Sequence, residues 1–152
     1  MSIKRQIAAN QVYHVYNRAI LKMTLFREPA DYLRFMIKMS QCKKHYPVQI
    51  LAFCIMPNHY HLLMKEAKIV AMENRPNISG FMQQLQTSYA KYFGMKYKHS
   101  GRVFQGVYKS KHVKTDEQLW QTTEYIHNNP LRKKYVKKAA QWPYSSLSNP
   151  DL

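Results

Sequence analysis

The chain has 152 residues, a length that suits one domain with a hydrophobic core of its own. Hydrophobic residues make up 45% and aromatic residues 13%, which excludes a chain that stays disordered. The 24 Lys and Arg residues against 8 Asp and Glu residues give a net charge of +16, which opposes compaction unless a polyanion screens it. Nucleic acid is therefore the expected partner, because phosphate contacts release counterions and drive binding.

An anionic membrane surface is the alternative partner for so basic a chain. No basic amphipathic helix dominates the sequence, and no apolar run approaches the length of a membrane span. The two cysteines, Cys42 and Cys54, and an N-terminus without a signal peptide favour a reduced cytoplasm over secretion. We therefore expect a cytoplasmic protein that does not act at a membrane.

The hydrophobic periodicity and the turn residues predict seven elements in the order β-α-β-β-α-β-α. They are strands at 11–19, 48–56, 59–65 and 104–113, and helices at 28–45, 77–98 and 115–129. This order predicts an α+β fold of the ferredoxin-like (split β-α-β) type. The expected architecture is an antiparallel sheet with helices on one face, followed by a C-terminal helix that bears a tyrosine. We expect one domain over 1–152, with a basic C-terminal tail at 131–152 that packs back on it.

The sequence Met56-Pro57-Asn58-His59-Tyr60-His61 places two histidines at the start of a strand. Pro57 and Asn58 are typical of a tight turn between two antiparallel strands. Side chains alternate along a strand, so His59 and His61 point to the same face. Two imidazoles on one face can bind one divalent cation. The alternative is a pair of packed or surface histidines.

Tyr125 and Asn129 stand four residues apart in the last predicted helix, so they should share one helical face. A tyrosine hydroxyl can act as a nucleophile, and an asparagine oxygen is a ligand that Mg²⁺ or Mn²⁺ accepts. With His59 and His61, Asn129 would complete a set of ligands that leaves positions open for a phosphate oxygen. The alternatives are a core aromatic residue and an ordinary helix end before Pro130. No residue stands out as the base that activates Tyr125.

Several ordered blocks of the chain resemble the single-tyrosine HUH transposases, and most closely their REP-associated branch. The blocks are Tyr13-His14-Val15-Tyr16-Asn17-Arg18, 56–63, 104–110, 125–130 and Trp142-Pro143-Tyr144-Ser145-Ser146. The resemblance implies that His59 and His61 are metal ligands, that Tyr125 is the nucleophile, and that Asn129 stands at the place of the third ligand. Relatives of the insertion-sequence branch carry glutamine at that place.

The resemblance also implies a function. Such enzymes nick and rejoin single-stranded DNA near small hairpins, through a covalent 5′-phosphotyrosine intermediate and with Mg²⁺ or Mn²⁺ as cofactor. We therefore expect a bacterial transposase that acts at the nucleoid, as a monomer or as a homodimer. Two positions depart from the family pattern: Ala19 replaces a glycine, and Val107 replaces an arginine that would contact DNA.

Basic grooves with aromatic platforms hold single strands, so basic and aromatic residues near the predicted site are candidate DNA contacts. They are Arg18, Arg102, Lys109, Lys111, Lys114, Tyr16 and Tyr108. Taken singly, each is better explained as a solvated charge or a packed ring, so the hypothesis concerns the group. Three other functions stay open: a non-catalytic module that binds single-stranded nucleic acid, a metal-dependent nuclease that uses water, and a domesticated relative that no longer moves DNA.

Overall fold

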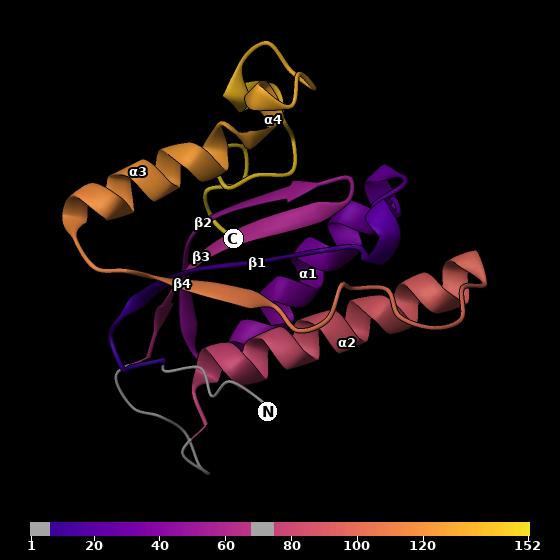
Figure 1. Ribbon diagram of the computed structural model, residues 1–152, viewed down its shortest axis with the longest axis horizontal. Coiled ribbons are helices and arrows are strands. Elements are labelled where there is room, and N and C mark those ends of the chain that lie inside the picture. The colour runs from indigo at the N-terminus through magenta and orange to yellow at the C-terminus, as the bar shows by residue number, and fades with distance from the viewer. Residues whose placement is uncertain (1–6, 68–74) are drawn as a thin grey trace.

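The computed structural model describes residues 7–67 and 75–152. A four-stranded antiparallel sheet forms its centre, with the strand order β2-β3-β1-β4 (Figure 1). The strands are β1 (Val12–Arg18), β2 (Val48–Met56), β3 (His59–Glu66) and β4 (Lys109–Val113). This order is that of the split β-α-β fold, so the predicted fold class is confirmed.

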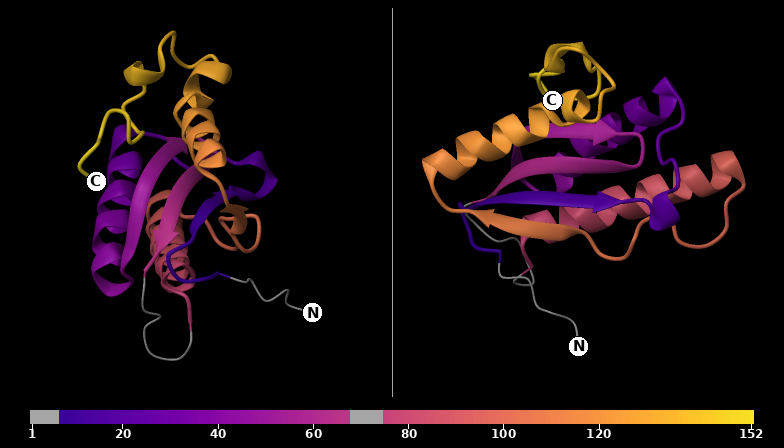
Figure 2. Two further views of the ribbon diagram at one scale, coloured as in Figure 1. Left: turned by 90° about the vertical axis from the view of Figure 1, so that its left-hand side faces the viewer. Right: turned by 45° about the horizontal axis from the view of Figure 1, so that its top comes forward.

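The helices lie on both faces of the sheet. They are α1 (Pro29–His45), α2 (Asn77–Tyr97), α3 (Asp116–His127) and the short α4 (Asn129–Arg132), with 3₁₀ turns at Ile20–Lys22 and Ala139–Gln141. Helices α1 and α2 pack against each other and cover one face, as predicted. Helix α3 lies across the opposite face, where it contacts β2, β3 and β4 (Figure 2). No helix among the described residues is long and apolar enough to cross a membrane.

The alternation of β3 separates the core from the open face of the sheet. Tyr60 is fully buried, with its ring 5.1 Å from that of Phe35 in α1 and its hydroxyl donating to Gln86 Oε1 in α2. His59 and His61 point the other way, toward α3. One strand therefore supplies both the aromatic core beneath the sheet and the polar residues above it.

The register between strands sets the rows of side chains on the open face. In the antiparallel β1–β3 pair, Tyr16 lies opposite His61, and Arg18 lies opposite His59. Across β1, Tyr16 pairs with Lys109 of β4. Because directly paired residues share a face, Lys109, Tyr16 and His61 form one row across the sheet.

Strand β4 begins at Lys109 and not at residue 104, so the predicted strand was too long. Phe104 makes only an isolated bridge with Ala19. Gly106 has a φ of +73°, a left-handed conformation that interrupts the strand. At Gly106 a side chain of β1, and not its backbone, makes the contact: Asn17 Nδ2 donates to the Gly106 carbonyl oxygen at 3.2 Å.

Helix α3 ends at His127, two residues before the predicted end. Asn128 leaves the helical path, and α4 begins at Asn129 with Pro130 in its first turn. Proline fits there because the first N–H groups of a helix have no partner within it. The prediction that one helix carries both Tyr125 and Asn129 is therefore wrong, since they belong to two successive helices, although both line the same pocket.

The segment Trp142–Ser146 runs along the outer edge of β2. The Ile55 N–H donates to the Tyr144 carbonyl and the Ser146 N–H donates to the Phe53 carbonyl, both at 2.9 Å. The Trp142 indole Nε1 donates to the Ile55 carbonyl at 3.0 Å, and the Tyr144 ring stacks on Tyr32 at 3.8 Å. The tail is thus fastened to the sheet by main-chain bonds and by packed rings.

Two buried carboxylates fix the starts of the long helices. Glu66, at the end of β3, accepts the N–H groups of Asn77 and Ile78 at the start of α2. Asp31, in the first turn of α1, accepts bonds from the Arg27 N–H at 2.9 Å and from Lys96 Nζ at 2.7 Å. Negative charge at a helix N-terminus is favourable, so both carboxylates help to position α1 and α2 under the sheet.

The Asp31 cluster predicts a pH-dependent stability. Burial raises the pKa of Asp31, but hydrogen bonds from Lys96, Tyr97, the Arg27 N–H and Tyr92 outweigh burial and lower it to about 2. A folded-state pKa below the ordinary value of 3.8 stabilises the fold above pH 4, by about 2 kcal/mol. Asp31→Asn should lose this stability at pH 7, and the difference from wild type should shrink as the pH falls from about 4 toward 2.

Urea denaturation of both proteins across this range measures the difference. Asp151→Asn, at an exposed carboxylate near the C-terminus, is the control and should match wild type at every pH. A difference between wild type and Asp31→Asn that stays constant down to pH 2 would contradict the linkage.

Candidate active site

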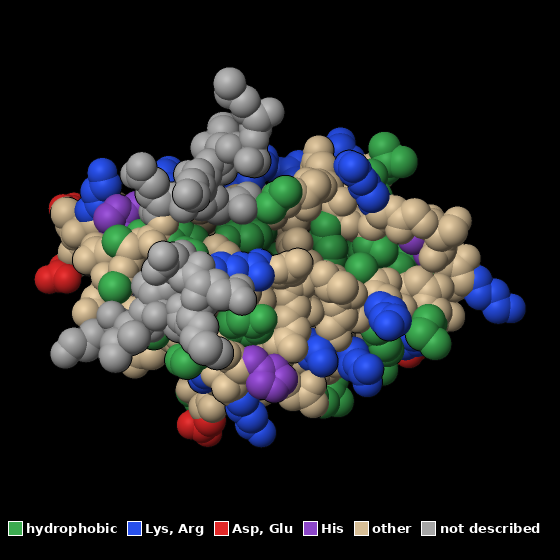
Figure 3. All heavy atoms as spheres, turned by 90° about the horizontal axis from the view of Figure 1, so that it is seen from below, with side chains coloured by type: hydrophobic (Ala, Val, Ile, Leu, Met, Phe, Trp, Pro, Cys, Tyr) green, Lys and Arg blue, Asp and Glu red, His purple; other side chains and the backbone are tan. Residues whose placement is uncertain are grey.

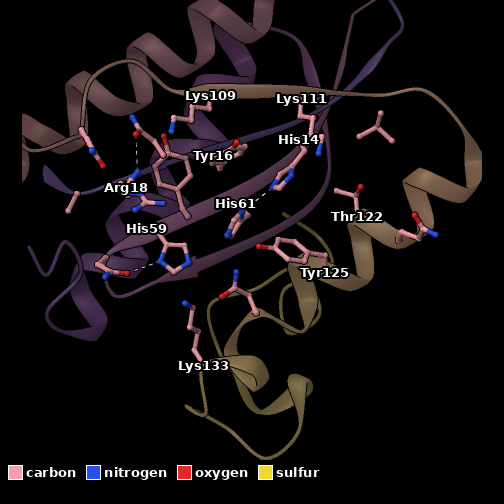
Figure 4. Close-up of a pocket in the computed structure, with 18 of the residues that line it drawn as sticks. His14, Tyr16, Arg18, His59, His61, Lys109, Lys111, Thr122, Tyr125 and Lys133 are labelled. Carbon is pink, nitrogen blue, oxygen red and sulfur yellow. Dashed lines mark hydrogen bonds between the residues drawn. The ribbon is translucent and has the colours of Figure 1, made fainter. Parts of the chain in front are cut away.

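A cleft of about 950 Å³ opens on the face of the sheet that α3 crosses. Strands β1, β3 and β4 form its floor, and α3 and α4 form one wall (Figure 4). The side chains that define it are His14, Tyr16, His59, His61, Lys109 and Tyr125. Residues far apart in the sequence therefore meet in one cleft.

His59 and His61 lie side by side in this cleft, with ring centroids 5.2 Å apart and planes nearly perpendicular. His59 Nδ1 lies 2.7 Å from Asn58 Oδ1, which can only accept, so Nδ1 donates and Nε2 keeps its lone pair. His61 Nδ1 lies 2.9 Å from His14 Nε2. In both imidazoles Nδ1 is the nitrogen that makes this hydrogen bond, so Nε2 is the nitrogen that could bind a ligand.

The surroundings keep the cleft histidines uncharged at neutral pH. Burial lowers the pKa of His59 to about 4, with Lys133 and Arg18 adding to the effect. Burial, followed by the neighbouring His14 and His59, lowers the pKa of His61 to about 2. His14 has a pKa of about 4, lowered by burial and then by Lys111. Neutral imidazole is the form that binds metal ions.

Asn129 contributes a side-chain oxygen to the site. Its side chain is 3% exposed, and Oδ1 accepts no hydrogen bond from the described residues. The amide lies close enough to His59 to raise the pKa of that imidazole against the other influences. A buried polar atom without a partner is uncommon, and a bound ion or water is one explanation for it. An amide oxygen is a donor that suits Mg²⁺ or Mn²⁺, whereas imidazole nitrogens suit transition-metal ions.

Acidic ligands are missing from this cleft. In the described parts of the chain, no three His, Cys, Asp or Glu side chains gather so that they could hold a metal ion. A cation bound at His59 and His61 would therefore take its remaining donors from Asn129, from water or from a bound phosphate. Such a site depends on its substrate to complete the coordination, as Mg²⁺ sites at phosphates commonly do.

Tyr125 extends from α3 toward the histidines. Its ring centroid lies 5.7 Å from that of His61 and 6.1 Å from that of His14, both edge to face. Tyr125 is 48% exposed and lines the cleft. Arg132 of α4 contacts Tyr125 in two ways. Its Nη2 donates to the Tyr125 carbonyl at 2.6 Å, and its guanidinium lies 4.1 Å from the centroid of the Tyr125 ring. A single chain thus brings its own tyrosine to its own histidines.

Four of the residues that the sequence suggested as DNA contacts line the cleft: Arg18, Lys109, Lys111 and Tyr16. Tyr16 lies against His14, with ring centroids 5.0 Å apart, so it also supports the histidines. Beyond the cleft, Lys and Arg side chains are spread over the face seen in Figure 3, where acidic side chains are few. The cleft itself is lined by five basic residues, which attract phosphate: Arg18, Lys22, Lys109, Lys111 and Lys133.

The other three suggested contacts lie elsewhere. Tyr108 is 4% exposed and its hydroxyl donates to Ser79 Oγ in α2, so the structure does not support its expected role as a stacking platform. The alternation of β4 explains this, because Tyr108 must face away from the side that Lys109 and Lys111 share. Arg102 and Lys114 are exposed but do not line the cleft.

Sequence reasoning missed three residues at the site. His14 shares a strand face with Tyr16 and Arg18, so the alternation of β1 could have placed it in the cleft. Arg132 and Lys133 could not have been found, because α4 turns them toward the site only after α3 has ended. Lys133 lines the cleft, and its charge lowers the pKa of His59.

Comparisons with known proteins show the family of this chain and support its fold. A family model described as "Transposase IS200 like" matches residues 8–129. A protein of Haemophilus influenzae that is assigned to the REP-associated tyrosine transposases is 31% identical over 128 residues, covering 77% of this chain and 69% of that protein.

Two solved structures share the fold. The structure of a REP-associated tyrosine transposase bound to a REP hairpin matches with a TM-score of 0.77 at 16% identity, over 96% of this chain and 82% of that chain. A protein of Deinococcus radiodurans R1 assigned as a transposase matches with a TM-score of 0.52 at 17% identity, over 84% of this chain and 97% of that chain.

The family match and the Haemophilus relative define the class of this protein as IS200-like transposases, enzymes of the HUH type. Within that class, the chain belongs to the REP-associated tyrosine transposases. The resemblance that the sequence blocks carry is therefore confirmed.

The contact between Arg132 and Tyr125 predicts a stability effect that is independent of any ligand. Arg132→Met should destabilise the fold by about 1 kcal/mol, since it removes one charged hydrogen bond and one exposed cation–π contact. Urea denaturation measures the change. Lys137→Met is the matched control, because the Lys137 bond to Gln141 uses its backbone N–H, and equal effects of the two substitutions would contradict the role of Arg132.

Proposed function

We propose that this transposase nicks and rejoins single-stranded DNA with Tyr125 as nucleophile and His59, His61 and Asn129 as ligands of Mg²⁺ or Mn²⁺. One observation carries the proposal: an accessible tyrosine lies beside two imidazoles that both present Nε2 and near a buried amide oxygen without a partner. A bound divalent cation would supply Lewis-acid stabilisation of the negative charge on the phosphate.

The reaction at Tyr125 is a transesterification. The Tyr125 Oη attacks the phosphorus, the bond from phosphorus to the 3′ oxygen breaks, and a 5′-phosphotyrosine forms. The phenol proton ends on the departing 3′ oxygen, which leaves as a hydroxyl. Attack by another 3′-hydroxyl on the phosphotyrosine reverses the step and joins strands. No water is consumed, so the bond energy is kept for rejoining.

The basic residues of the cleft give the DNA strand its path. Arg18 and Lys109 stand at the end of β1 and the start of β4, and Lys111 and Lys133 stand at two other sides of the cleft (Figure 4). Each can neutralise one phosphate of a strand that passes the tyrosine. Since the fold neighbour with a TM-score of 0.77 is bound to a REP hairpin, we propose a DNA hairpin as the substrate here too, which implies work at the bacterial nucleoid.

One chain is sufficient for the chemistry as proposed. Tyr125 and the histidines come from the same chain, so catalysis needs no second subunit to supply a tyrosine. The two rival functions, a non-catalytic binding module and a nuclease that uses water, need no tyrosine at this place. The exposed Tyr125, with its ring 5.7 Å from that of His61, favours the tyrosine mechanism over both.

The covalent intermediate provides the direct test. Wild-type protein with labelled single-stranded hairpin DNA and Mn²⁺ should give, on a denaturing gel, a labelled band shifted by the mass of the protein. Tyr125→Phe, and wild type with EDTA, should lose this band by at least 100-fold. Tyr46→Phe, at a tyrosine outside the cleft, is the matched control and should keep it.

Other outcomes distinguish the rivals. Cleavage by Tyr125→Phe without a shifted band would establish the water-using nuclease. Hairpin binding of wild type without cleavage or adduct, across many hairpin sequences, would favour the binding module or a domesticated enzyme.

Asn129 gives a second test, at the level of metal binding. Asn129→Ala should weaken Mn²⁺ binding by roughly tenfold, because one of the few protein donors is removed, while Asn129→Asp should strengthen it by adding a charged ligand. Isothermal titration calorimetry without DNA measures both. Asn149→Ala removes an amide outside the cleft and is the control. Wild-type affinity of Asn129→Ala would show that this amide is not a ligand.

A further inference from the structure

We propose that His14 is a positioning residue that holds His61 in the tautomer and orientation needed for metal binding. The inference rests on the proposed metal site and deepens it. It assigns to His14 the task of accepting the His61 Nδ1 proton, so that His61 Nε2 is free for the cation.

The geometry places His14 at one atom of His61. His14 lies on β1, two residues from Tyr16, which is the direct partner of His61 on β3. From this diagonal position His14 Nε2 reaches His61 Nδ1 at 2.9 Å, with ring centroids 5.1 Å apart (Figure 4). This hydrogen bond uses Nδ1 of His61. The other ring nitrogen, Nε2, takes no part in it.

The shared proton decides which nitrogen of His61 can bind a metal. Two neutral imidazoles at this distance hold one proton between them. If it sits on His61 Nδ1, His61 Nε2 carries a lone pair; if it sits on His14 Nε2, His61 Nε2 must carry its own proton and cannot be a ligand. Only the first arrangement matches His59, whose Nδ1 donates to Asn58 Oδ1. Both ligands then present Nε2 to the same space.

The surroundings of His14 suit the role of acceptor. The Tyr16 ring packs against His14 on one side, and Tyr125 meets its edge at a centroid distance of 6.1 Å. Lys111 is its cross-strand neighbour on β4. A neutral ring fixed between two tyrosines can orient a ligand histidine in the way that outer partners of metal sites do.

Metal affinity of the full chain without DNA tests this role. His14→Phe keeps a ring of similar size but loses the acceptor, and we expect Mn²⁺ binding to weaken by roughly 10- to 100-fold in calorimetry. His14→Gln, whose Oε1 can accept the same proton, should recover most of the affinity. His45→Phe, at an exposed histidine at the end of α1, is the matched control and should bind as wild type does.

A second readout reports the tautomer without metal. Imidazole ¹⁵N shifts of His61 should show a protonated Nδ1 in wild type. In His14→Phe they should move toward the Nε2–H form that free histidine prefers. Thermal unfolding of each variant shows that the fold is kept, so a purely structural role of His14 would leave the shifts of a folded variant unchanged.

The controls separate this inference from the proposed function. Wild-type Mn²⁺ affinity and an unchanged His61 tautomer in His14→Phe, together with lost affinity in His61→Ala, would overturn the role of His14 alone. Mn²⁺ binding that does not depend on His61 would overturn the metal site and the role of His14 together.

Discussion

The pairing of β1 with β3 is the constraint on which the site depends. Its register puts Tyr16 opposite His61 and Arg18 opposite His59, and it brings His14 to His61 on the diagonal. A shift of one residue would turn each of these side chains to the other face and send Tyr60 out of the core. Because Tyr60 is fully buried beneath the sheet, the energy of the core enforces the register of the polar residues above it.

The tyrosine is held by a different device. Helix α3 crosses the open face, and the break at Asn128 lets α4 fold back so that Arg132 binds the Tyr125 carbonyl. The same break turns Asn129 toward His59, although the side chain no longer follows the helical repeat of α3. The histidines on a strand and the tyrosine on a separately anchored helix therefore reach the cleft from two independent elements.

Much of the fold follows from local patterns in the sequence. The turn at Pro57-Asn58 and the alternation of Tyr60 with His59 and His61 predict the hairpin and its two faces. The predicted start of β4 and the predicted end of α3 were wrong, because they depend on contacts between residues that are far apart or in the next element. Gly106 adopts a left-handed turn in which Asn17 binds its carbonyl, and α3 ends early where a second helix starts at Asn129. Tyr108 was predicted as a DNA contact because it is an aromatic residue near basic ones, whereas its alternation with Lys109 turns it to the other face.

The tail along β2 affects whether the sheet of one molecule can pair with the sheet of another. An exposed sheet edge is a template on which a second chain can add a strand, the first step of aggregation. The Ile55 N–H and the Phe53 carbonyl are already bonded to Tyr144 and Ser146, so the end of β2 near the turn is closed. In the described chain the opposite edge is β4, where Lys109 and Lys111 would face the same charges of another copy. Saturated bonds at one edge and like charges at the other keep a very basic protein from polymerising through its sheet.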